Sequence, residues 1–166
     1  MNLPPSLSRL LLGPNAELHE AVALTLMTSA LYLFNTGLVL IACRFGYASP
    51  QMTPYMATCM LLGAVVFYGL LRSGWSQRLP DPKLIMVQGV YCAFAVCLGY
   101  TTVHLPLRGV VLAFLPAILL PCQFALPPRR LFHLTAIMIL MMASTTVLHW
   151  FISQGEKEWL DDALRF

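Results

Sequence analysis

Five long apolar runs constrain this chain more than any other feature of its sequence. They cover residues 21–43, 55–71, 84–103, 109–126 and 131–151. A bilayer core about 30 Å thick is crossed by roughly 20 apolar residues in a helix. Hydrophobic residues make up 58% of the chain and charged residues 10%, against about 45–50% and about 25% in soluble domains. The sequence therefore predicts an all-α, polytopic transmembrane bundle with five spans.

The predicted bundle occupies residues 18–152. Residues 1–17 are expected to form a cytoplasmic lead-in, because prolines interrupt the apolar stretch that a signal peptide requires. The second run extends back toward Gln51 if its helix begins directly after Pro50. Residues 153–166 form a polar tail, and we expect this tail to lead to a sixth span that is missing from the chain.

The fourth run contains two prolines, Pro116 and Pro121. Proline removes a backbone donor and clashes with the preceding turn, so each residue predicts a kink. Membrane helices tolerate such prolines when neighbouring groups satisfy the freed carbonyls. We therefore expect a kinked span here, and a broken or re-entrant segment is the alternative.

The polar segment at residues 71–88 carries the strongest signal for orientation. Arg72, Arg78 and Lys83 lie in it, and its two prolines prevent a helix from running through. The N-terminal, second and fourth connecting segments together hold six Lys and Arg residues, against four in the first, the third and the tail. The positive-inside rule then places the N-terminus and residues 71–88 in the cytoplasm. Five spans leave the tail outside.

The sequence carries no phosphate-binding loop, no HExxH and no nucleophile elbow, so we predict no catalytic residue, no cofactor and no metal site. The five cysteines form no CxxC pair, which favours apolar packing over disulfides or zinc. Two histidine pairs remain as alternatives for a shared metal or proton site: His104 with His149 near the outer face, and His19 with His133 near the inner face. Basic residues form no stripe that would indicate nucleic acid as a partner.

Two sets of polar residues are candidates for packing or signalling. Asn35 lies deep in the first run, where its amide needs a partner across helices, and both structural packing and ligand contact are open. Residues 72–74 close the second run as a helix C-terminus with a cation and a glycine cap. Arg72 can donate to Asp81 or to the last carbonyls of its own helix. Anchoring of Arg72 to lipid headgroups is the alternative.

Four short motifs occur in order, most of them between residues 66 and 126, and the last ends at Arg130. They are FYGLLRSG at Phe67–Gly74, DPKL at Asp81–Leu84 followed by Gln88, the pair Arg108 and Gly109, and FALPPRR at Phe124–Arg130. In this order they resemble the N-terminal multi-span membrane region of bacterial GGDEF-type diguanylate cyclases. The catalytic GGDEF domain of those enzymes converts GTP to cyclic di-GMP.

The resemblance implies a membrane-embedded sensory or anchoring region in the bacterial inner membrane that regulates cytoplasmic cyclic di-GMP synthesis. It further implies six spans, a homodimer in the lipid bilayer, and a C-terminal cytoplasmic catalytic domain that is missing from this chain. A small membrane transporter or channel subunit is one alternative, and the membrane sensor region of a histidine kinase is another. With Asn35 included, the candidate signalling or packing residues are Asn35, Arg72, Ser73, Gly74, Asp81, Gln88, Arg108 and Gly109.

Overall fold

A computed structural model of the chain describes residues 16–163. Its helices are η1 (Ala16–Leu18), α2 (His19–Arg44), α3 (Thr53–Arg72), η2 (Trp75–Arg78), α4 (Ile85–Thr102), α5 (Leu105–Leu112), α6 (Phe114–Ala125) and α7 (Pro128–Ala163). No β-strand occurs among the described residues, and one isolated bridge joins Ala48 to Val103. Five helical segments of this part of the chain are long and apolar enough to cross a membrane. The predicted all-α bundle is confirmed.

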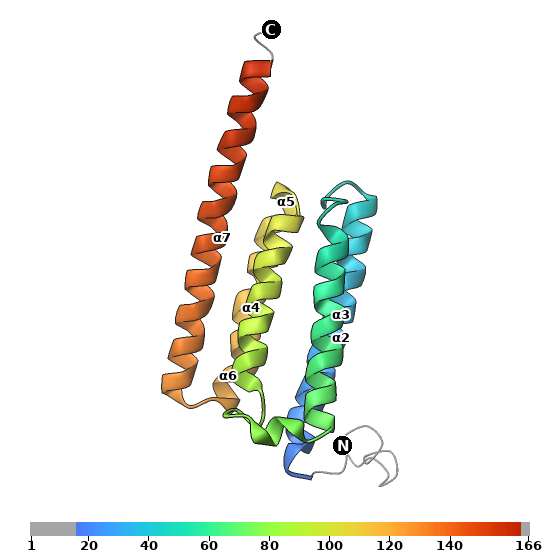
Figure 1. Cartoon of the computed structure of the whole chain (residues 1–166), viewed down its shortest axis with the longest axis vertical. Helices are drawn as coiled ribbons and strands as arrows, with labels where there is room; N and C mark the ends of the chain where they lie inside the picture. The colour runs from blue at the N-terminus through green and yellow to red at the C-terminus, as the bar shows by residue number, and fades with distance from the viewer. Residues whose placement is uncertain (1–15, 164–166) are drawn as a thin grey trace.

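The helices run up and down through the bundle in chain order (Figure 1). α2 packs chiefly on α3, and α4 lies at the centre, where it packs on α3, α6 and α7. In Figure 1, α3 and α4 lie in front of α2 and α6. α2 and α6 therefore lie on the same side of the α3–α4 layer, with α4 between them.

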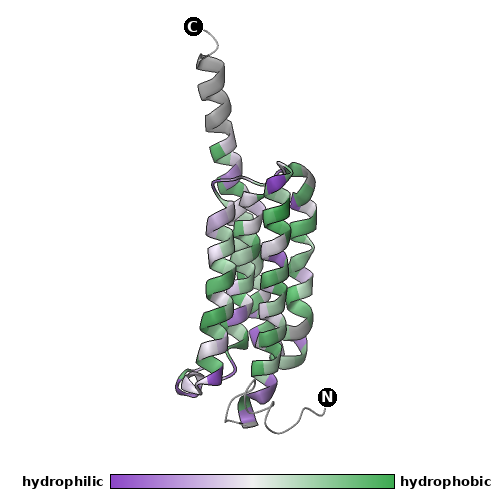
Figure 2. Cartoon of the chain, turned by 90° about the vertical axis from the view of Figure 1, so that its right-hand side faces the viewer, coloured by the Kyte–Doolittle hydropathy of each residue, from purple (hydrophilic) through white to green (hydrophobic). Residues whose placement is uncertain are grey.

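The outer surfaces of the helices are apolar along most of their length. Figure 2 shows hydrophobic colours over the body of the bundle and hydrophilic colours mainly near its two ends. Large side chains such as Phe34, Val65, Phe124 and Leu140 are exposed on these surfaces. Water would not solvate an apolar band of this extent, whereas lipid does. The chain is thus built as a multi-pass membrane protein.

The turn between α3 and α4 has a defined backbone. Gly74 adopts φ 73°, a left-handed conformation that glycine takes at little cost, and its N–H donates to the carbonyl of Leu71 over 3.1 Å. The predicted glycine cap of the second span is therefore confirmed. Asp81 Oδ2 accepts the backbone N–H of Met86 over 2.9 Å, which satisfies a donor in the first turn of α4.

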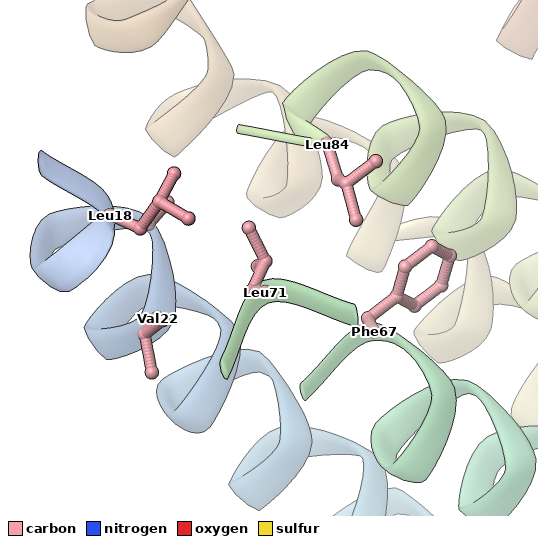
Figure 3. Close-up of a cluster of buried hydrophobic side chains, with 6 residues drawn as sticks. Leu18, Val22, Phe67, Leu71 and Leu84 are labelled. Atoms are coloured by element: carbon pink, nitrogen blue, oxygen red, sulfur yellow. The ribbon is translucent and has the colours of Figure 1, made fainter. Parts of the chain in front are cut away.

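A cluster of buried side chains lies beside this turn (Figure 3). Leu18 is the last residue of η1 and Val22 lies in the first turn of α2. Phe67 and Leu71 come from the end of α3, and Leu84 is the residue before α4. Leu71 is 1% exposed and Val22 is fully buried. Because three segments contribute, this cluster fixes the ends of α2, α3 and α4 relative to one another.

The opposite end of the bundle is joined through backbone hydrogen bonds. The N–H of Ser49 donates to the carbonyl of Thr102 over 2.8 Å, and the N–H of His104 donates to Tyr47 over 2.9 Å. These bonds connect the α2–α3 loop to the short link between α4 and α5.

The fourth apolar run is interrupted at Ala113, between α5 and α6. Pro116 has no N–H to offer the carbonyl of Leu112, so the regular hydrogen-bond ladder stops at this point. The helix continues through Pro121. The segment Leu107–Ala125 still has the length and hydropathy of a single span, as a kinked span requires.

α7 is longer than the apolar run that predicted it. The run ends near residue 151, yet the helix continues to Ala163 and has 36 residues, which corresponds to about 54 Å. In Figure 1 it extends beyond the other helices at the end of the bundle opposite the N-terminus. The boundary of the hydrocarbon region therefore does not coincide with the end of the helix.

Candidate functional site

A groove with a volume of about 440 Å³ runs along one side of the bundle, between α2 and the α5–α6 segment. α4 forms its floor, through residues that include Gly89 and Val96. On α2 the lining extends from Ala21 to Ala42. These residues span about 32 Å along the helix axis, close to the thickness of a bilayer core of about 30 Å. The groove therefore follows the full depth of the membrane.

Few polar side chains line this groove, and two of them join α2 to α4. Gln88 Nε2 donates to Thr25 Oγ1 over 2.7 Å. The hydroxyl of Tyr32 lies 2.9 Å from the Cys92 thiol. Hydrogen bonds between helices stabilise a bundle in lipid because water is not available to replace them. These two pairs hold α2 against α4 on the groove side of the bundle.

Asn35 also lines the groove and is half-buried. Its Nδ2 donates to the carbonyl of Leu31, one turn earlier in the same helix, over 2.9 Å. Asn35 was expected to bond to another helix, whereas among the described residues its partner lies in its own helix. The amide still lies at a groove wall and not on the surface that packs on α3.

The stripe of α2 that faces the groove has a regular spacing. We name the groove stripe as the seven residues that alternate at intervals of three and four, namely Ala21, Leu24, Thr28, Leu31, Asn35, Leu38 and Ala42. Leucine alternates in it with small or polar residues. This stripe does not stand out in the sequence, because α2 is apolar on nearly all sides and no polar face sets the stripe apart. The alternation of leucine with small or polar residues was the available signal.

The predicted residues at the α3–α4 turn lie together, but their contacts differ from those expected. Arg72 Nη1 donates to the Tyr68 hydroxyl over 3.2 Å, and its guanidinium lies 5.8 Å from the centre of the Tyr68 ring. Tyr68 thus replaces Asp81 and the helix carbonyls as the observed partner, and Asp81 caps α4 instead. Ser73 Oγ donates to the carbonyl of Leu70 over 3.2 Å.

An ion pair also forms near the α3–α4 turn. Lys83 Nζ lies 3.6 Å from Glu20 Oε2, and both side chains are exposed. An exposed pair of this kind contributes about 0–1 kcal/mol. This ion pair therefore adds little to the stability of the α3–α4 turn.

At the opposite end of the bundle, Arg108 connects α5 to α7. Its Nε donates to the carbonyl of Val103 over 3.2 Å, and Nη2 lies 2.6 Å from His149 Nε2. The guanidinium lies 5.1 Å from the centre of the Tyr100 ring. Gly109 follows within α5, and a Cβ at this position would meet no atom within 4 Å. Of these two residues, which form one of the motifs behind the resemblance, Arg108 makes specific contacts. Gly109 makes no close contact that would require a glycine.

The histidines do not form a metal site in the described part of the chain. No group of three or more His, Cys, Asp or Glu side chains is placed there to hold an ion. His149 contacts Arg108 and packs edge-on against Tyr100, with ring centres 6.3 Å apart. These contacts of His149 are with Arg108 and Tyr100, so they do not support the site that was considered for His104 and His149.

The candidate residues thus divide between three places along the bundle. Gln88 and Asn35 lie in the groove, residues 72–81 lie at the α3–α4 turn, and residues 108–109 lie near the opposite end of the bundle. The groove offers apolar surface with a few donors and acceptors, an arrangement that suits binding of an apolar group or a helix and not catalysis. Comparison with known protein families, curated proteins and solved structures found no match to this chain.

Proposed function

We propose that this chain is the membrane-embedded sensory and anchoring region of a bacterial diguanylate cyclase. In this proposal it lies in the inner membrane with its N-terminus in the cytoplasm. The catalytic domain belongs to the same longer protein and is reached through a further span. The chain acts as a homodimer and controls how two catalytic domains meet.

The observation that carries the proposal is the place of the resembling residues in the packing. Phe67, Leu71 and Leu84 belong to the buried cluster that fixes the ends of α2, α3 and α4. Gln88 lies one turn into α4, lines the groove and bonds to Thr25 of α2. The residues that carry the resemblance therefore connect the groove to the α3–α4 turn, which is the connection that a sensor requires.

A sensor also needs two arrangements that its signal favours to different degrees. α2 is held to α4 along the groove by the Gln88–Thr25 and Tyr32–Cys92 pairs. Occupation of the groove by an apolar ligand, or a change in bilayer thickness, would shift the spacing of α2 and α4. The buried cluster would pass that shift to the α3–α4 turn.

The two alternatives gain no comparable support. A transporter or channel for polar solutes needs a polar path, and the groove lining is predominantly apolar. The polar side chains in it are those of Thr28, Tyr32, Asn35 and Gln88. A histidine kinase sensor would use the same physical coupling, and the cellular product distinguishes it from a cyclase.

The test compares Arg72→Ala with Arg78→Ala in the full-length protein, with cellular cyclic di-GMP and the amount of inserted protein as readouts. Both arginines are exposed cations of the same connection. Arg72 contacts Tyr68 in α3. We expect Arg72→Ala to change cyclic di-GMP at unchanged insertion, and Arg78→Ala to leave it unchanged. Equal effects, an effect on insertion alone, or a wild-type protein that does not alter cyclic di-GMP would each contradict the proposal.

A further inference from the structure

The groove stripe of α2 has the residue pattern of a helix–helix interface. Its first, third, fifth and seventh members are the small or polar residues Ala21, Thr28, Asn35 and Ala42. The members between them are leucines. Spacing of three and four residues is the pattern by which two helices pack at a small crossing angle. Small and polar residues at such an interface allow close approach and hydrogen bonds in the membrane.

Apart from Ala21, which is buried in the cluster beside the α3–α4 turn, this stripe has no helix packed against it in the described structure. Leu24, Leu31 and Leu38 are 38%, 49% and 43% exposed, respectively. The neighbouring stripe of α2, which includes Val22, Thr25 and Thr36, is buried within the bundle. α2 therefore carries two adjacent packing surfaces, and the chain covers one of them.

The side chain of Asn35 indicates which partner covers the groove stripe. Asn35 lies three positions after the middle of the 21–43 run, which places it about 5 Å from the midplane of a bilayer centred on that run. One N–H of its amide is used by Leu31 within the helix. An amide has a second N–H and a carbonyl oxygen, so it can pair with an identical amide. Hydrocarbon offers no other partner for these groups.

Two copies of one membrane protein have the same orientation in the bilayer, so an α2–α2 pair between copies is parallel. In a parallel pair, equivalent positions of the two seams meet, and Asn35 meets Asn35 of the second copy. We propose that α2 forms a homodimer interface through the groove stripe, with the two Asn35 amides hydrogen-bonded across the two-fold axis. The inference rests on the proposed function in that it names the interface of the proposed homodimer.

Other occupants satisfy the stripe less well. An antiparallel helix would bring a different position against Asn35 and would not pair equivalent layers. A lipid acyl chain fills apolar space but offers neither donor nor acceptor to the amide. Only a second copy of this chain supplies both the leucine layers and the matching amide at one depth.

The test measures association of the 166-residue chain in phosphatidylcholine vesicles by energy transfer between labelled copies as lipid dilutes the protein. We expect Asn35→Val to raise the dissociation constant by roughly 3- to 30-fold, the range expected for an interhelical hydrogen bond. The matched control is Leu33→Val, because Leu33 is exposed on α2 and lies outside the stripe. This control should leave the constant unchanged.

A second variant locates the contact independently. Asn35→Cys should form an intermolecular disulfide under mild oxidation, above the level given by the native cysteines of the parent chain, and Leu33→Cys should not. A monomeric chain at all dilutions, a dimer unaffected by Asn35→Val, or cross-linking at Leu33 in place of Asn35 would overturn the interface. Uptake of a spin-labelled acyl chain by a monomer would identify lipid as the occupant. None of these measurements reads cyclic di-GMP, so failure of the interface and failure of the proposed function are distinguishable.

Discussion

Single residues hold the groove together through a small number of polar contacts. Thr25 is 2% exposed, and its hydroxyl accepts a hydrogen bond from Gln88. Neither group would find water at that depth if the other were removed. The contact between α2 and α4 is therefore more sensitive to substitution than its size suggests.

The first prediction concerns this contact. Gln88→Leu should destabilise the bundle by about 0.6–2 kcal/mol, the range of interhelical hydrogen bonds in membranes. The same substitution at Gln123, an exposed residue of α6, is the control and should have a smaller effect. A double-mutant cycle with Thr25→Val, measured by reversible unfolding in detergent or bicelles, isolates the pairwise energy. A coupling energy near zero would show that the bond does not stabilise the fold.

Sequence reasoning identified several of these residues but not all of their partners. It found Arg72 and Asp81 from charge and position, yet the observed partners are Tyr68 and the backbone of Met86. A motif fixes which residues lie in a turn, whereas the rotation of each side chain depends on neighbours brought together by folding. Tyr68 lies one turn before Arg72 in the same helix, so this contact could have been predicted from helical spacing.

At the scale of helices, the pattern of apolar residues predicted the first three spans to within about two residues at each end once the second was extended back, which is the usual precision of helix boundaries. Hydropathy reports where lipid ends, and those helices end close to that depth. α7 is different, since its helix continues to Ala163 beyond the apolar run. Backbone hydrogen bonds persist in water, and residues such as glutamate and lysine in the polar tail favour helix.

Close packing of α3 on α4 gives a second prediction. A Cβ at Gly63 would overlap the ring of Tyr91, whereas a Cβ at Gly69 of the same helix would meet nothing within 4 Å. Gly63→Ala should therefore destabilise the bundle by about 1–3 kcal/mol through overpacking. Gly69→Ala should be neutral or slightly stabilising, because alanine favours helix. Thermal unfolding in the same detergent compares them. Equal stabilities of the two variants would contradict this, because they would mean that α3 and α4 can move apart to accommodate the added methyl group.

For the whole molecule, the fold places predicted cytoplasmic segments at one end. The N-terminal end of α2, the α3–α4 connection and the α6–α7 turn share the lower end in Figure 1, and the α2–α3 loop lies at the upper end. Because five spans alternate in direction, one orientation measurement fixes all connections. The distribution of cations along the sequence predicts this orientation, and the fold alone does not.

The third prediction tests that orientation. A cysteine at Gln77 should resist a membrane-impermeant thiol reagent in intact cells and react after permeabilisation. A cysteine at Gln51, exposed in the opposite loop, should react in intact cells. The parent chain, with its five native cysteines, gives the background. Reaction at residue 77 in place of residue 51 would invert the whole topology.

The length of α7 has a mechanical consequence at the face of the bundle opposite its N-terminus. The helix has 36 residues and continues past the ends of its neighbours. A straight rod of that length converts a small rotation at its base into a large displacement at its tip. A tilt of about 10° around Pro128 would carry Ala163 sideways by about 9 Å, given a rise of about 1.5 Å per residue. Adjustments in tilt of this size accompany changes in bilayer thickness. A change in bilayer thickness would therefore move the far end of α7 much further than it moves the end at Pro128.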